Sequence, residues 1–295
     1  MAQRKVAVIG LGGMGAGMAR ALLAAGFPVT VYNRTASKAQ PLRELGATIA
    51  ASAEDAVRDT EVVVLSLADE AAVEQVLFGE VIWRMRPGVT VVDTSTVSPS
   101  FARNTALRLS ASGIRRVEAC VIGNPMMADG GQLRVFTSGV ESDVDEVRDV
   151  LVALSQEIRY LGPAGRASTM KLAFNLLLGV QTAALAETVA FAEGAGLDRE
   201  LLLGALNNSG WRSAVLSFRA EFMRNRSYQP AGFRAALMHK DLRLASEDSA
   251  GHSVPLPLVD LAARRFADVL AAGRGDEDAA VIAEVAPAPV PVTVD

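Results

Sequence analysis

The first half of the chain alternates short apolar runs with stretches whose apolar residues recur at helical spacing. Each apolar run is almost continuous, as in Val62-Val63-Val64-Leu65, which is typical of a strand buried on both faces. Such strands separated by helices predict a parallel sheet covered on both sides. Strands are expected at residues 5–9, 29–32, 61–67, 90–93, 117–121, 133–137 and 158–161, and helices at 14–25, 36–45, 71–77 and 99–112.

The strand pattern stops after the run Gly162-Pro163-Ala164-Gly165. From residue 167 to residue 195 Gly179 is the one strong breaker, which predicts a single helix of roughly 42 Å. This helix is apolar on most faces, so we expect other helices to bury it. Further helices are expected at residues 199–207, 214–224, 235–250, 256–272 and 276–285.

A glycine-rich motif joins the first expected strand to the first expected helix. It reads Gly10-Leu11-Gly12-Gly13-Met14-Gly15, and a second strand follows, which is the context that a dinucleotide-binding fingerprint requires. Gly10 permits the tight turn, Gly12 lets the backbone approach a diphosphate, and Gly15 lets the helix pack close to the strand. The helix N-terminus then offers amide N–H groups to the phosphates. The alternative is a glycine-rich turn without a ligand.

The residues that follow the second strand indicate which dinucleotide binds. NAD-binding proteins usually place a carboxylate there, whereas this chain has Asn33-Arg34-Thr35. Arg34 can bind a 2′-phosphate through two N–H groups, while Asn33 and Thr35 can donate further hydrogen bonds and Lys38 can add charge. The sequence therefore favours NADP(H) over NAD(H) as cofactor. A solvated arginine in a loop is the alternative.

Together these patterns predict an α/β Rossmann domain followed by an all-α helical domain, joined by a long interdomain helix. We assign residues 1–163 to the NADP-binding Rossmann domain and residues 164–285 to the helical C-terminal and dimerisation domain. Residues 286–295 are rich in Pro, Ala and Val and are expected to form a disordered tail.

Composition narrows the choice of partners and location. The chain has 295 residues, a net charge of −4 and no cluster of Lys and Arg, so nucleic acid or an anionic membrane is not expected as a partner. Charged residues interrupt the long apolar helix, which argues against a membrane span. The single cysteine, Cys120, excludes an internal disulfide and fits a cytoplasmic location. His239 and His252 lack metal-ligand spacing, so no metal is expected.

Two polar residues of the long helix are candidates for catalysis. Lys171 lies near the start of the helix, and Asn175 follows one turn later on the same face. A lysine in apolar surroundings gives up its proton more readily and can act as proton donor and acceptor, and Asn175 can orient it or hold a substrate oxygen. The alternative is a lysine that reaches solvent from the first turns of the helix.

Four motifs in this order resemble the β-hydroxyacid dehydrogenases, which include 3-hydroxyisobutyrate dehydrogenase and semialdehyde reductases and have the imine reductases as a related branch. The motifs are Gly10–Gly15 with Met18-Ala19, residues 93–99 (DTSTVSP), Gly165 through Lys171 to Asn175, and Phe233 with residues 237–242 (LMHKDL).

The resemblance implies a role for each matching position. Lys171 would be the catalytic lysine that protonates the carbonyl oxygen, and Asn175 its helper. Thr96, Leu67 and Ala68 would contact the cofactor. Lys240 would close over the cofactor from the helical domain, and Phe233 would line the same lid.

The loop that binds the substrate carboxylate in the family departs from the pattern. The family has Val-Ser-Gly-Gly here, whereas this chain has Val121-Ile122-Gly123-Asn124 followed by Pro125. Ile122 cannot donate a hydrogen bond, and Pro125 has no backbone N–H. Phe174 is a second departure, since an asparagine is common there. We expect Ile122, Gly123, Asn124 and Trp211 to line the pocket of a small-molecule substrate.

The predicted function is that of an NADP-dependent oxidoreductase, which reduces an aldehyde, semialdehyde or keto acid or oxidises the matching alcohol. The alternatives are an imine reductase, in which Lys171 orients an iminium substrate, and a non-catalytic NADPH-binding sensor. The apolar helix is longer than a domain of about 130 residues can easily cover. The resemblance also implies dimers with interlocking helical domains, so we expect a homodimer.

Overall fold

The computed structural model describes residues 4–286 of the chain, which divides into two compact units, Met1–Lys171 and Leu172–Asp295. The division falls inside helix α9 (Arg166–Gly194). The tail expected at residues 286–295 lies outside the described residues, except for Ala286.

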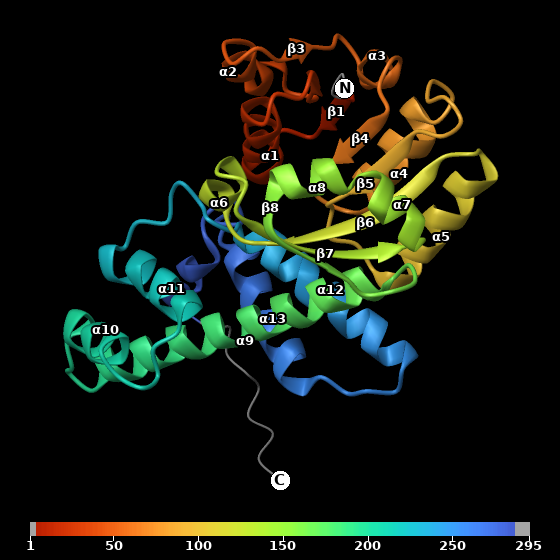
Figure 1. Cartoon of the computed structure of the whole chain (residues 1–295). Coiled ribbons are helices and arrows are strands. Elements are labelled where there is room, and N and C mark those ends of the chain that lie inside the picture. Colours follow the sequence, from red (N-terminus) through yellow and green to blue (C-terminus); the bar gives the residue numbers. More distant parts are fainter. Residues whose placement is uncertain (1–3, 287–295) are drawn as a thin grey trace. The chain divides into compact units, whose positions relative to one another are not determined.

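An eight-stranded sheet forms the centre of the N-terminal unit, with the strand order β3-β2-β1-β4-β5-β6-β7-β8 (Figure 1). The order in which successive strands are added to the sheet reverses at the parallel β1–β4 pair, and α/β sheets bind ligands at such a point, at the carboxyl ends of the strands. The strands are β1 (Val6–Ile9), β2 (Val29–Tyr32), β3 (Thr48–Ile49), β4 (Val62–Leu65), β5 (Thr90–Asp93), β6 (Arg115–Ile122), β7 (Leu133–Gly139) and β8 (Ser155–Tyr160).

The sheet is parallel, as the sequence predicts, except for one pair of strands. Strands β6 and β7 are antiparallel, with Cys120 opposite Phe136 in the register. The segment between them, residues 123–132, holds only the short helix α6 (Pro125–Asp129). A parallel crossover needs a dozen or more residues, so this short segment returns the chain in the opposite direction.

Helices cover both faces of the sheet, and alternate strand residues supply two separate cores (Figure 1). Val6 and Val8 pack with α1, α2 and α8, whereas Ala7 and Ile9 pack with α3, α4 and α5. The helices are α1 (Gly13–Ala24), α2 (Gln40–Arg43) after the 3-10 turn Ala36–Ala39, α3 (Ala53–Val57), α4 (Glu70–Glu74) with the π-helical turns Gln75–Val81, α5 (Pro99–Ala111), α7 (Glu141–Glu146) and α8 (Arg148–Leu154).

The described part of the C-terminal unit is helical, as the sequence predicts, apart from one isolated bridge between Arg234 and Asp278. Its core is built from the apolar faces of all its helices and includes the fully buried Phe266 and Leu203. Besides its share of α9 the unit contains α10 (Arg199–Asn207), α11 (Ala214–Asn225), α12 (Ala235–Gly251), α13 (Pro257–Ala271) and the 3-10 turns Ala279–Glu284.

Helix α9 is only partly covered by its own chain, in line with the expectation that it is longer than one domain can easily cover. Leu177 is 54% exposed and Phe191 is 78% exposed, although Ala186 and Val189 are in the core. Because α9 is apolar all round, the neighbouring helices of one chain bury only part of its surface. By length and composition alone α9 could cross a membrane, a test that the core helix of a soluble protein also passes.

Candidate active site

The loop after β1 is shaped by three glycines with different surroundings. A Cβ atom at Gly10, which has a φ of +94°, would overlap the backbone oxygen of Ser66, and one at Gly15 would overlap the oxygen of Gly10. A Cβ atom at Gly12 would meet nothing within 4 Å. The loop is thus tightly packed beneath Gly10 and Gly15 and open above Gly12, where a diphosphate would need space.

Gly12 is also the N-cap residue of α1, and no side chain caps this helix end. The first amides of a helix have no partner within the helix, so they need an acceptor from elsewhere. An open backbone in front of such amides fits a bound diphosphate. Among the predicted contacts, Leu11 is buried, while Gly13 and Met14 form the first turn of α1.

Asn33 holds the glycine loop in place rather than projecting into solvent. Its Oδ1 accepts a hydrogen bond from the Leu11 N–H (2.9 Å), and its Nδ2 donates to the Thr35 carbonyl (3.1 Å). The amide therefore connects the end of β2 with the loop after β1. The sequence analysis named Asn33 as a phosphate donor, and this positioning contact adds a second use for it.

A hollow of about 380 Å³ lies at the end of β2 and is lined by two guanidinium groups. One belongs to Arg34, which is exposed, and the other to Arg43 in α2, which the sequence analysis did not name. No carboxylate is among the residues that line this hollow, so its charge is positive. A phosphate group on an adenosine ribose fits such surroundings better than an unmodified ribose does.

The ends of β4 and β5 supply the next predicted contacts. Leu67 follows β4, and its N–H donates to the Ser95 hydroxyl (3.0 Å). Thr94 fixes the same place, because its hydroxyl donates to the Leu65 carbonyl (2.6 Å). Next to these contacts Ala68 is exposed and Thr96 is partly exposed. The strands β1, β2, β4, β5 and β6 are mutually parallel. The residues that follow them therefore lie together at the carboxyl-terminal end of the sheet.

Lys171 lies at the same end of the sheet, because its side chain is bonded to the backbone near the end of β6. Its Nζ donates a hydrogen bond to the carbonyl oxygen of Val121 (2.8 Å), and the residue is half-buried. The Val121 carbonyl thus fixes where the ammonium lies, one residue before the loop Ile122-Gly123-Asn124. The Lys171 ammonium is therefore bonded to the protein backbone in this structure.

The side chains of the loop after β6 pack inward or cap a helix. Ile122 packs against Cys120, Phe136 and Ala167. The Asn124 side chain accepts from the Met127 N–H (3.0 Å) and so caps α6. Burial, together with the nearby Glu118 carboxylate, raises the pKa of the Cys120 thiol to about 12. Cys120 is therefore a buried thiol and not a nucleophile at neutral pH.

The remaining predicted site residues belong to the C-terminal unit, and two of them meet at a buried carboxylate. Asn175 donates from Nδ2 to Asp241 Oδ2 (2.6 Å), and Lys240 Nζ lies 2.9 Å from Asp241 Oδ1. The sequence analysis did not assign Asp241 to the site, although its place beside Lys240 was the available signal. Trp211 is 79% exposed in the link between α10 and α11.

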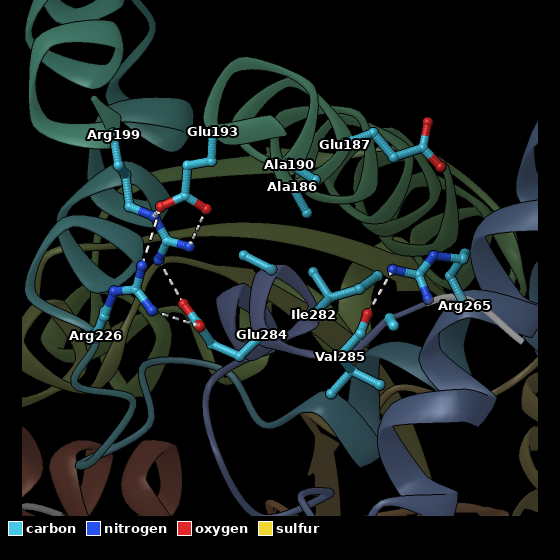
Figure 2. Close-up of a pocket in the computed structure, with 12 residues that line it drawn as sticks. Ala186, Glu187, Ala190, Glu193, Arg199, Arg226, Arg265, Ile282, Glu284 and Val285 are labelled. Carbon is cyan, nitrogen blue, oxygen red and sulfur yellow. Dashed lines mark hydrogen bonds and ion pairs between the residues drawn. The ribbon is translucent and has the colours of Figure 1, made fainter. Parts of the chain in front are cut away.

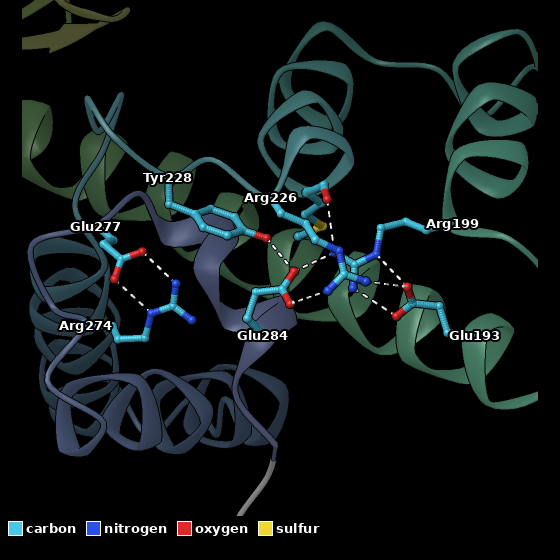
Figure 3. A network of polar contacts seen from close by, with 8 residues as sticks. Glu193, Arg199, Arg226, Tyr228, Arg274, Glu277 and Glu284 are labelled. Atoms are coloured by element: carbon cyan, nitrogen blue, oxygen red, sulfur yellow. Dashed lines mark hydrogen bonds and ion pairs between the residues drawn. The ribbon is translucent and has the colours of Figure 1, made fainter.

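A second hollow, of about 420 Å³, lies within the C-terminal unit between α9, Arg265 and the end of the described chain (Figure 2). One wall is a closed ring of four charged side chains that alternate in sign. Arg199 pairs with Glu193 (2.9 Å) and Glu284 (2.5 Å), and Arg226 pairs with the same two carboxylates (3.0 and 3.2 Å) (Figure 3). The ring neutralises its own charge, which indicates a structural role.

No group of three His, Cys, Asp or Glu side chains is arranged as metal ligands among residues 4–286. His239 has its pKa lowered by burial and by the nearby Arg243, so it is neutral at physiological pH.

Two family models cover nearly all of the described chain. The model of the NAD binding domain of 6-phosphogluconate dehydrogenase matches residues 5–162. The model described as the NAD-binding of NADP-dependent 3-hydroxyisobutyrate dehydrogenase matches residues 165–286.

Individual relatives agree with these matches. Glyoxylate/succinic semialdehyde reductase 1 of Arabidopsis thaliana is 30% identical over 282 residues, which is 95% of this chain and 97% of that protein. The crystal structure of 3-hydroxyisobutyrate dehydrogenase from Salmonella typhimurium has a TM-score of 0.90 and 30% identity, covering 96% of this chain and 99% of that chain. The reductive aminase from Aspergillus terreus, in complex with NADPH and ethyl levulinate, has a TM-score of 0.65 and 28% identity, covering 96% and 99%.

These matches span both units, and they confirm the Rossmann domain, the helical domain and the long helix between them as one known fold. The chain therefore belongs to the β-hydroxyacid dehydrogenase family of NAD(P)-dependent oxidoreductases, the family of 3-hydroxyisobutyrate dehydrogenase, to which the imine reductases are related.

Proposed function

We propose that this protein is an NADP-dependent reductase of a small carbonyl compound, an aldehyde, semialdehyde or keto acid, and that it oxidises the matching alcohol in reverse. The proposal depends on one observation: the Val121 carbonyl binds the Lys171 ammonium at the carboxyl-terminal end of the sheet, where the glycine loop also lies. When bound, NADPH supplies the hydride for the carbonyl carbon.

Within this proposal Lys171 donates the proton that the substrate oxygen needs as the carbonyl is reduced. An ammonium has three N–H groups, and the Val121 carbonyl accepts from one of them, which orients the head group. Asn175 follows one turn later and is held by Asp241. Thr96 and the segment Leu67-Ala68 lie at the ends of β5 and β4 and would contact the nicotinamide half of the cofactor.

The preference for NADP over NAD is part of the proposal. Arg34 and Arg43 line the hollow at the end of β2, and no carboxylate lines it with them. A guanidinium pairs with phosphate oxygens through two parallel N–H groups, whereas an NAD site places a carboxylate on the ribose hydroxyls. That the similar Aspergillus terreus reductive aminase binds NADPH supports the same choice.

A second candidate function is the reduction of imines. The loop after β6 offers a substrate few side-chain donors, because Ile122 is apolar and Asn124, whose Oδ1 caps α6, has only its Nδ2 amide to donate. Such a wall suits a substrate without a carboxylate, and a reductive aminase is among the similar structures.

We further propose that the protein is a cytoplasmic homodimer. Leu177 and Phe191 on α9 are exposed in the single chain, and a second copy of the helical unit would cover such apolar surface. The single cysteine fits a reducing compartment.

The experiment is a substrate panel with a matched pair of lysine variants. NADPH oxidation would be followed by absorbance with aldehydes, semialdehydes, keto acids and cyclic imines. Lys171→Ala should lower turnover by on the order of 10²–10⁴. Lys5→Ala, an exposed lysine at the amino end of β1, should leave turnover unchanged.

Each possible result identifies a class of function. Highest turnover with semialdehydes or keto acids supports the first candidate, and highest turnover with cyclic imines supports the second. Tight NADPH binding without turnover of any class would leave the non-catalytic sensor.

A further inference from the structure

Glu118 lies in the middle of β6 and is a buried carboxylate that accepts three hydrogen bonds. Its side chain is about 2% exposed, and the first turn of α9 supplies most of its partners. Oε1 accepts from the Gly165 N–H (2.5 Å), and Oε2 accepts from both the N–H (3.2 Å) and the hydroxyl (3.0 Å) of Ser168. Glu118 therefore caps α9 from the neighbouring strand.

The same strand also holds Lys171, three residues further along. Val121 accepts the hydrogen bond from Lys171 Nζ, so β6 binds α9 at two points. Gly165, Ser168 and Lys171 are spaced by three residues, which places them along one face of the helix. The Glu118 contacts and the Lys171 contact thus fix the same face of α9 against the same strand.

The other charges nearby show that the Glu118 carboxylate is directed toward the helix. Arg116 is fully buried and pairs at 2.7 Å with Asp93, whereas its distance to Glu118 is 3.4 Å. The main compensation for the Glu118 charge is therefore the set of N–H groups at the start of α9, where the helix dipole is positive. A buried ion pair by itself is weak evidence that a contact stabilises the fold. Hydrogen bonds to Glu118 from the start of α9, in contrast, define where the helix begins.

We propose that Glu118 is a positioning residue for Lys171. By capping the first turn of α9 it fixes the position and rotation of the helix, and so keeps Nζ on the Val121 carbonyl. The proposal rests on the proposed role of Lys171 as proton donor. A displacement of a reacting group by about 1 Å can lower turnover by about 10²-fold, so the loss of this cap should be visible in the rate.

The test uses two variants that weaken the cap and one control. Glu118→Gln places an amide NH₂ where Ser168 needs an acceptor. Ser168→Ala removes only the hydroxyl that donates to Glu118. Thr169→Ala is the control, because the Thr169 hydroxyl donates to the carbonyl of Gly165, the residue just before α9, and makes no hydrogen bond to Glu118.

With the best substrate of the panel, Glu118→Gln should lower kcat by about 10- to 100-fold and Ser168→Ala by less, while the KM for NADPH changes less than about twofold. Thr169→Ala should retain the wild-type kcat. In single-turnover measurements on a Lys171→Ala background, Glu118→Gln should cause no further loss, because both changes act on one step.

Three results would overturn the proposal. These are a wild-type kcat in both cap variants, an equal fractional loss from Glu118→Gln with and without Lys171, or a parallel loss of NADPH affinity. If Glu118→Gln does not fold, Ser168→Ala decides the question by the same criteria. If Lys171→Ala itself retains full turnover, the proposed function fails, whereas an inactive Lys171→Ala with unaffected cap variants removes only this inference.

Discussion

At the scale of single residues, the glycines of the loop after β1 have different roles: Gly15 is required for packing, whereas Gly12 leaves space for a ligand. Gly15 has no room for a side chain because the backbone of Gly10 is in the way, so its role is already visible in the unliganded fold. Gly12 has open space in front of it, and its lack of a side chain has no use in the fold itself. Substitutions at these two positions should therefore give different results.

We expect Gly12→Ala to lower NADPH affinity by at least about tenfold while the free energy of unfolding changes by less than about 1 kcal/mol, since the added methyl group meets no protein atom. Gly15→Ala should lower both, because its methyl group overlaps the Gly10 oxygen. Gly79→Ala, which also meets nothing within 4 Å and lies outside the loop, is the control. Calorimetric titration and urea unfolding give the two quantities. Unchanged NADPH affinity in Gly12→Ala would contradict the placement of the diphosphate.

Arg34 and Arg43 give a second prediction at this scale. Arg34→Ala and Arg43→Ala should each weaken NADPH binding by about 10-fold or more and leave NADH binding nearly unchanged, because a charged hydrogen bond contributes about 1.5–3 kcal/mol. Fluorescence titration with both dinucleotides measures the ratio. Arg84→Ala is the control for the loss of a surface guanidinium, because Arg84 pairs with Glu54 and does not line the hollow at the end of β2. An equal loss for both dinucleotides would show that the arginines do not read the 2′-phosphate.

At the scale of elements, the ring of Glu193, Arg199, Arg226 and Glu284 connects the end of α9, the start of α10, the turn after α11 and the last described turn of the chain. Burial alone would raise the pKa of Glu284, but hydrogen bonds from Arg199 and Tyr228 outweigh burial, and the pKa is lowered. The pKa of Glu193 is lowered chiefly by its hydrogen bonds from Arg199. Both carboxylates are therefore charged in the folded state at neutral pH.

The stability that these carboxylates contribute should depend on pH with a defined sign. A carboxyl group whose pKa is lower in the folded than in the unfolded chain stabilises the fold at pH values above its unfolded-state pKa, near 4.5. This contribution is lost as the pH falls through the folded-state pKa. Glu284→Gln should thus cost about 1–3 kcal/mol at pH 7, and the difference from wild type should shrink below about pH 4.5.

Urea unfolding between pH 3.5 and pH 7 measures this difference. Glu200→Gln is the control, because its contact with Arg224 is exposed and such pairs contribute about 0–1 kcal/mol. A Glu284→Gln deficit that is constant over the whole pH range would show that the ring does not act through its charge.

At the scale of the whole molecule, the exposed apolar side chains of the C-terminal unit need an explanation that one chain does not provide. They include Leu177 and Phe191 of α9, together with Leu201 of α10 and Leu258 of α13. Large apolar side chains exposed on several helices are typical of an interface, and a second copy is the partner we propose.

Light scattering at micromolar concentration should give twice the mass of the chain for the wild type. Phe191→Glu should shift the mass toward one chain, because an unpaired carboxylate in an apolar interface is costly. Trp83→Glu changes an equally exposed aromatic residue of the N-terminal unit and should leave the mass unchanged. A wild-type mass of one chain would refute the homodimer.

Much of the candidate site was predictable because its residues follow local rules. The glycine loop, Arg34 and Lys171 each stand at a defined place in a strand–helix pattern, and the structure shows these places. Glu118 was not predicted as a site residue, because it lies 47 and 50 residues along the chain from the groups it faces. Asp241 was not predicted although it follows Lys240, because its contact with Asn175 spans 66 residues. Arg43 lies close to Arg34 in the sequence, but it belongs to another element, and only folding brings both to one hollow. Helices α3, α6, α7 and α8 were also missed, since five to seven residues carry too little periodicity to be recognised.

The sequence by itself determined the alternation of strands and helices, the dinucleotide loop and the change to an all-helical second half, because these depend on the chemistry of neighbouring residues. The tertiary structure decided the antiparallel β6–β7 pair, the capping of α9 by Glu118, the Asn175–Asp241–Lys240 contacts and which side chains of α9 stay exposed. Strand direction, buried charge partners and the extent of burial depend on which distant segments pack together, and local patterns in a sequence do not contain that information.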